Sequence, residues 1–128
     1  MTDIQQHRSV PIDWRVAGQS SYILDRIQEV YGASDGYGLA AYFSRYPAAP
    51  LFLLSARAEI QRVFGGTATP RLDLVTFSAY EPAHLYVVIP TPLSPAEAYA
   101  KVTELDESWW LDNIQRAGVD ITANVEFR

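Results

Sequence analysis

Apolar residues in the first half of the chain recur three and four positions apart, which is the spacing of one face of an α-helix. The pattern predicts helices over 20–31, 39–46 and 50–64. Gly32 and Gly65 follow the first and the third, where glycine commonly ends a helix. A short strand is the alternative over 39–46. The first half is therefore expected to be mainly helical.

Alternation of apolar and polar residues replaces the helical spacing in the second half. It predicts strands near 71–79, 84–90 and 119–127. The segment 78–83 contains a proline and is expected to form the turn of a hairpin between the first two strands. The last strand alternates cleanly, which is typical of a strand with one buried face and one face in water.

A helix is predicted between the second and third strands. Ser94 and Glu97, with Pro95 between them, form the pattern of a capping box at a helix start. The apolar spacing of this helix changes phase near Asp106, which predicts a kink or break there, with Asp106 as candidate cap of a second helix. Gly118 is expected to end the helical segment.

These elements predict a small α+β fold with an antiparallel or mixed sheet and helices packed on one face, a two-layer sandwich. A strand–helix–strand crossover is right-handed and makes its strands parallel, so the last strand is expected beside the first hairpin strand, antiparallel to it. A chain of 128 residues is long enough for one domain, 1–128. Residues 1–19 lack sustained periodicity and are interpreted as an N-terminal arm.

The net charge of −5 is concentrated in the last part of the chain. From Ser94 onward there are seven acidic and three basic residues. This distribution argues against nucleic-acid and anionic-membrane binding, which use clustered Lys and Arg, and favours a basic protein partner. The polar N-terminus and the absence of long apolar runs indicate a cytoplasmic protein.

No motif in the sequence predicts catalytic residues, a metal site or a cofactor. The chain has no cysteine, and neither of its two histidines lies in a motif. The glycine-rich segment 32–38 lacks the lysine of a phosphate-binding loop. Glu104 and Glu107 would be neighbours on a helix, but two carboxylates are fewer than oxygen-coordinated cations usually recruit.

Two adjacent tryptophans lie within a cluster of acidic residues. Adjacent helical residues are about 100° apart, so one indole is expected in the core and the other at its edge. Packing is the favoured interpretation, because large aromatic residues are mostly buried. In the functional interpretation, one indole anchors a partner protein. The predicted partner-binding residues are Asp106, Glu107, Trp109, Trp110 and Asp112.

The leading hypothesis is a non-enzymatic, acidic protein-interaction module, for example of a toxin-neutralising or immunity type. The alternative is a small-molecule-binding protein or small enzyme, with a cleft between the sheet and the tyrosine-rich helices. The candidate ligand-binding residues of that cleft are Asp35, Tyr42, Tyr46 and His84. A third hypothesis is a subunit whose sheet face or edge completes a homodimer.

Overall fold

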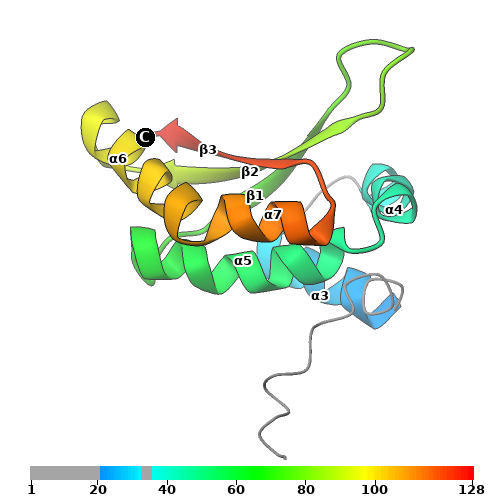
Figure 1. Ribbon diagram of the computed structural model, residues 1–128, viewed down its shortest axis with the longest axis horizontal. Coiled ribbons are helices and arrows are strands. Elements are labelled where there is room, and N and C mark those ends of the chain that lie inside the picture. The colour runs from blue at the N-terminus through cyan, green and yellow to red at the C-terminus, as the bar shows by residue number, and fades with distance from the viewer. Residues whose placement is uncertain (1–20, 33–35) are drawn as a thin grey trace, which may run out of the picture.

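The computed structural model describes residues 21–32 and 36–128. The predicted arm 1–19 and the candidate ligand residue Asp35 lie outside the described residues. Figure 1 shows helices gathered along a small sheet. The elements in chain order are α3 (Ser21–Tyr31), α4 (Gly36–Arg45), α5 (Ala49–Phe64), β1 (Arg71–Val75), β2 (His84–Thr91), α6 (Pro95–Leu105), the π-helix η1 (Asp106–Trp110), α7 (Leu111–Ala117) and β3 (Ile121–Phe127).

The three helices predicted in the first half are confirmed as α3, α4 and α5. The strand alternative over 39–46 is wrong, and α4 begins earlier than predicted, at Gly36. Gly32 ends α3 with a φ of 62°, and its N–H donates to the Gln28 carbonyl over 2.8 Å. Glycine adopts this left-handed conformation without the strain that a side chain adds.

The sheet is mixed, with the strand order β1-β2-β3. β1 pairs with β2 antiparallel, and β2 pairs with β3 parallel. The fold class, α+β with a mixed sheet, is confirmed. The predicted position of the last strand is wrong, because β3 lies beside β2 and not beside β1. The crossover returns to the strand that it left, as consecutive strands commonly lie side by side in a sheet.

Two strands are shorter than predicted. β1 ends at Val75 and not near residue 79, because the chain turns at Ser78, whose Oγ accepts the Tyr80 N–H over 3.0 Å. Such local bonds compete with pairing to a neighbouring strand. β3 begins at Ile121 and not at 119, since Gly118 ends α7 in a left-handed conformation. The hairpin loop 76–83 extends away from the rest of the molecule in Figure 1.

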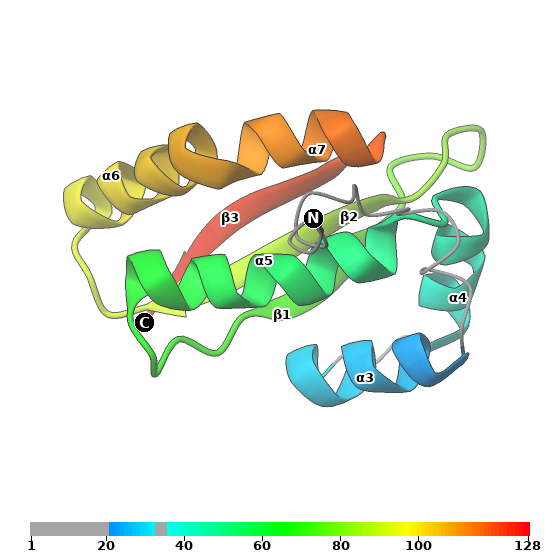
Figure 2. The ribbon, with the colours of Figure 1, turned by 60° about the horizontal axis from the view of Figure 1, so that its bottom comes forward.

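Helices α5 and α7 lie on the same side of the sheet in Figures 1 and 2. The strand register explains which side is apolar, because Leu72 pairs with Val87 and Val87 pairs with Ala123. These paired residues share a face, and the residues next to them in each strand share the other. The finer prediction of a two-layer sandwich stays a prediction.

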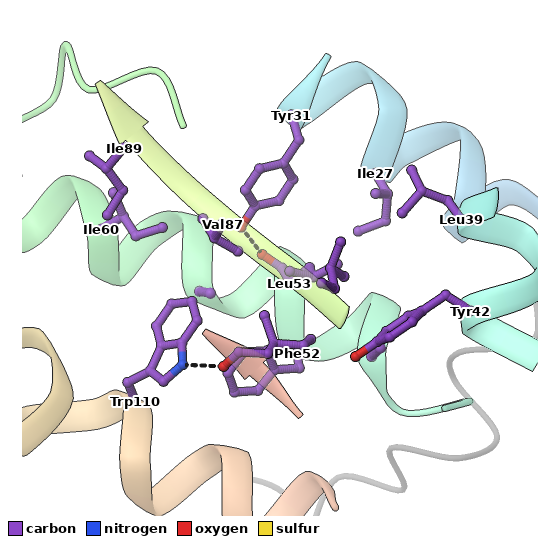
Figure 3. Packing of buried hydrophobic residues seen from close by; sticks show 14 of the residues in the cluster. Ile27, Tyr31, Leu39, Tyr42, Phe52, Leu53, Ile60, Val87, Ile89 and Trp110 are labelled. Carbon is purple, nitrogen blue, oxygen red and sulfur yellow. Dashed lines mark hydrogen bonds between the residues drawn. The ribbon is translucent and has the colours of Figure 1, made fainter. Parts of the chain in front are cut away.

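The core joins this apolar sheet face to α3, α4, α5 and the segment around η1 (Figure 3). Its largest fully buried side chains are Trp110, Phe52, Ile27, Leu53, Ile60, Leu85, Ile89, Leu105, Ile121 and Val87. The Tyr31 hydroxyl donates to the Leu53 carbonyl over 2.5 Å and thereby ties α3 to α5. Each burial removes apolar surface from water, which is the main stabilising contribution to a fold of this size.

The predicted capping box at the start of α6 is confirmed. The Ser94 Oγ accepts the Glu97 backbone N–H over 3.3 Å, and Glu97 Oε1 accepts the Ser94 N–H over 3.3 Å. Both bonds satisfy N–H groups that lack a partner at a helix start. The position of α6 is therefore set locally, before any packing is considered.

The predicted change of phase near Asp106 is the π-helix η1. In an uninterrupted α-helix, Leu105 and Trp110 would face directions about 140° apart, yet both are buried. The wider turn absorbs one extra residue, and the Leu111 N–H donates to the Asp106 carbonyl. The prediction that Asp106 caps a second helix is wrong, because its φ of −59° and ψ of −48° continue the helix.

Candidate functional site

Trp110 is a core residue, with an exposed fraction of 2%. Its indole Nε1–H donates to the Ile121 carbonyl over 3.0 Å, a bond drawn as the dashed line from Trp110 in Figure 3, and its ring meets Phe52 edge-on at 5.1 Å. The prediction that one tryptophan is buried and the other peripheral is confirmed. The inclusion of Trp110 among the partner-binding residues needs correction, because its indole is enclosed by the core.

Trp109 is the peripheral tryptophan. Its half-buried ring lies 5.1 Å from the ring of Phe52, and its carbonyl accepts a hydrogen bond from Asn113 over 2.8 Å. Next to η1, the Arg62 guanidinium donates to the Ser108 Oγ over 2.7 Å and so links α5 to this turn. These contacts hold η1 on α5, while part of the Trp109 indole remains accessible to a partner.

The carboxylates close to Trp109 in sequence are exposed, except that of half-buried Asp106. Asp112 forms an ion pair with Arg116 at 3.1 Å, in which both side chains are mostly in water. Within the described parts of the chain, Glu104, Asp106 and Glu107 form no ion pair with a basic side chain. We call Glu104, Asp106, Glu107, Trp109, Leu111 and Asp112 the acidic helical surface.

Leu111 is the residue of this surface that the sequence did not single out. It is 56% exposed, although leucine is usually buried. The extra residue of η1 is the cause, since it turns Trp110 inward and leaves Leu111 on the outer side. Its position directly after the two tryptophans was the available signal, but the phase of the helix there was ambiguous.

Asp106 is the half-buried member of the acidic helical surface. Burial, and in second place the neighbouring charge of Glu107, raise the pKa of its carboxyl above the ordinary value. Both causes disfavour the ionised form. We therefore expect ionisation of Asp106 to cost stability, and a cation near its carboxylate to reduce that cost.

Asp106→Asn is expected to increase the free energy of unfolding at about pH 7. The folded-state pKa of Asp106 lies above the unfolded value, so ionisation costs stability above that folded-state pKa. This cost disappears as the pH falls below the unfolded-state pKa, so the stability gained by Asp106→Asn should vanish near about pH 3.

Urea unfolding at both pH values measures the stability gained by the substitution. Asp112→Asn, which removes only an exposed ion pair, is the control and should show no such gain. An equal effect of Asp106→Asn at both pH values would contradict a raised pKa of the Asp106 carboxyl in the folded protein.

The residues of the predicted ligand cleft meet at the start of β3. The Tyr42 hydroxyl donates to the Asp120 carbonyl over 2.9 Å, and its ring lies 4.8 Å from that of Tyr46. His84 Nδ1 is 3.4 Å from Asp120 Oδ2, and its Nε2 is 3.3 Å from Thr122 Oγ1. The structure thus brings Tyr42 and His84 to Asp120, while Tyr46 joins the cluster through its contact with Tyr42. The sequence missed Asp120, because it placed β3 away from the strand that carries His84.

Tyr42 acts in this cluster as a neutral hydrogen-bond donor. Burial, followed by the proximity of Tyr46 and Asp120, raises the pKa of its phenol above the ordinary value. A cavity beside this cluster is lined by Tyr42, Arg45, Leu74 and Thr76 among others and measures about 260 Å³. Typical small-molecule sites measure roughly 300–1,000 Å³ and enclose their ligand. Tyr42 lines both the cluster and this cavity, whereas His84, Tyr46 and Asp120 do not line the cavity, so the polar groups of the cluster lie mostly outside it.

The described residues were compared with the requirements of a metal site and of a membrane-spanning helix. There, no three carboxylate or imidazole side chains converge on a common point. No helix in 21–32 or 36–128 has the length and apolarity to cross a bilayer. No protein-family model, no curated protein and no solved structure matches this chain.

Proposed function

We propose that this protein is a non-enzymatic interaction module whose acidic helical surface binds a basic partner protein. Neutralisation of a toxin, as by an immunity protein, is one concrete form of such a function. The observation that carries the proposal is a short helical stretch in which the carboxylates of Glu104, Asp106 and Glu107 form no ion pair within the described residues, next in sequence to half-buried Trp109 and exposed Leu111.

This combination is suited to a basic partner for two physical reasons. Carboxylates that form no ion pair within their own molecule attract a positively charged surface and steer its approach. Exposed leucine and accessible indole supply the apolar contact that charges alone do not, and tryptophan is enriched among residues that dominate binding energy. Asp106 adds a half-buried charge that a partner's cation would stabilise.

The test is capture of the partner from native cell extract by the purified protein and by a charge-reversed variant, with identification by mass spectrometry. The variant carries Glu104→Lys, Glu107→Lys and Asp112→Lys, whose side chains are exposed. We expect a stoichiometric basic protein with the wild type and at least about a hundred-fold weaker binding to the variant, since reversal turns three attractive charges repulsive.

The matched control reverses three exposed charges elsewhere, through Asp25→Lys, Asp73→Lys and Glu81→Lys. It has the same net charge as the test variant and should retain the partner. Equal capture by the wild type and the test variant would contradict the proposal. Equal loss with both variants would show attraction to net charge instead of a defined surface, and would contradict it as well.

A further inference from the structure

One edge of the sheet is formed by β3, whose outward backbone groups can be assigned from the strand register. The Arg128 N–H donates to the Thr91 carbonyl over 3.1 Å. The backbone N–H and C=O groups of even-numbered residues in β3 therefore point toward β2. Backbone groups alternate in direction along a strand. Ile121, Ala123, Val125 and Phe127 therefore point their N–H and C=O groups away from the sheet.

Side chains satisfy two of these outward groups. The Trp110 indole donates to the Ile121 carbonyl, and the Val125 N–H donates to Asn124 Oδ1 over 3.0 Å. The N–H and C=O of Ala123 form no hydrogen bond to any residue that the structure describes. The edge is thus closed at its beginning and open around Ala123, where an incoming strand could pair.

The helical segment α6–η1 borders this open edge. Figure 2 shows α6 and α7 alongside β3. Tyr99 packs on Phe127 at 5.8 Å, while Trp110 bonds to Ile121, so the segment runs antiparallel to β3. Asp106 follows Tyr99 by seven residues and lies on the same helix face to within about 20°. It therefore borders the middle of the edge, near Ala123.

Two aromatic side chains mark the far end of the same edge. Tyr99 and Phe127 are 55% and 44% exposed, although they contact each other. Together with Asp106 they surround unpaired backbone groups with apolar area and a negative charge. Extended segments bind to exposed strands through main-chain hydrogen bonds, and neighbouring side chains supply their selectivity.

We propose that β3 receives an extended basic segment of the partner protein as an additional strand, with a Lys or Arg of that segment paired with Asp106. The inference rests on the proposed function and names its mode of binding. A second copy of this chain fits less well, because its β3 carries Glu126 and no basic residue, and the chain has a net charge of −5.

The probe is an acetylated and amidated seven-residue peptide in which threonine and lysine alternate. Binding to the full chain is followed by backbone amide shifts in NMR spectra and by titration. A peptide with glutamate in place of lysine tests the charge. A lysine peptide with methylated backbone nitrogens at alternate positions tests strand pairing, independently of any change in the protein. We expect amide shifts over 123–127, and at least about ten-fold weaker binding of both altered peptides.

Two variants test the same surface from the protein side. Ala123→Pro removes an outward N–H and leaves the pairing of β3 with β2 intact, as proline is tolerated at such edge positions. Asp106→Asn removes the charge. Each is expected to weaken binding of the lysine peptide at least about ten-fold, whereas the control Ala123→Val keeps the N–H and should bind as wild type does.

Failure of this inference is distinguishable from failure of the proposed function. Absence of lysine-peptide binding, or equal binding of the N-methylated peptide with shifts confined to residues 104–112, would overturn strand addition while partner capture stayed sensitive to charge reversal. Partner capture that is insensitive to reversal of Glu104, Glu107 and Asp112 would overturn the proposed function itself.

Discussion

Trp110→Ala is expected to lower the free energy of unfolding by about 3–5 kcal/mol, the range for loss of a large buried aromatic side chain. The change empties the space against Phe52 and removes the indole bond to the Ile121 carbonyl. Because small domains are stable by only about 5–15 kcal/mol, this single change would remove a large part of the total. Urea denaturation followed by circular dichroism measures the effect.

Two further variants separate the loss of packing from the loss of the indole hydrogen bond. Trp109→Ala removes a half-buried indole at the periphery and should cost distinctly less than the change at Trp110. Trp110→Phe keeps most of the apolar contact but leaves the Ile121 carbonyl without its donor, at a cost of about 1–3 kcal/mol. Equal losses for Trp109→Ala and Trp110→Ala would show that the assignment of core and peripheral tryptophan is wrong.

Insertion of one alanine between Glu107 and Ser108 is expected to destabilise the protein at least as strongly, by about 3–5 kcal/mol or more. The added residue rotates Trp110 and everything up to Gly118 by about 100° relative to α6. Trp110 and Ile114 would then leave the core together. Thermal or urea unfolding, with near-ultraviolet circular dichroism to report tryptophan packing, measures this result.

Deletion of Glu107 is the matched control for the insertion. It shortens the spacing of Leu105 and Trp110 from five residues to four, which a regular α-helix places on one face. We therefore expect a folded protein in which η1 has become α-helical, with Trp110 still buried. Comparable destabilisation by the insertion and the deletion would contradict the role of η1 in absorbing one extra residue.

Much of the fold follows from local sequence signals. The periodicity of α3 and α5 and the capping box at Ser94 depend on neighbouring residues, and their predicted positions are confirmed. The change of phase at Asp106 was also visible. The sequence did not show whether this change is a helix break or a π-helix, because both displace the apolar stripe in the same way. A helix cap at Asp106 was the simpler interpretation, and it is wrong.

The position of β3 was beyond local signals. Its alternation predicts a strand with one apolar face but not the neighbour with which it pairs, since pairing depends on the length and burial of both candidate strands. This error separated His84 from Asp120 in the prediction. It also concealed the edge at Ala123, whose outward direction is defined only by pairing with β2.

The partner-binding residues could be predicted from the sequence only in part. Their charges could be read directly, and Glu107 and Asp112 are exposed as a solvated surface requires. Which of Trp109 and Trp110 faces the core depends on the geometry of the turn between them and Leu105. Leu111 becomes an exposed residue for the same reason. The wrong assignment of Trp110 to the partner-binding residues and the failure to predict Leu111 there therefore both arise from η1.

The central position of β2 has a consequence for how the chain folds. β1 reaches β2 through the loop 76–83, whereas β3 reaches it only after α6, η1 and α7 have been traversed. Pairing of distant segments is slower than pairing of neighbours. We therefore expect the hairpin to form before β3 joins, which leaves one side of β2, beside Leu85, Val87 and Ile89, unpaired for that interval. Such apolar edges promote aggregation. Fast formation of α6, η1 and α7, which connect β2 to β3, would shorten this exposure as well as complete the sheet.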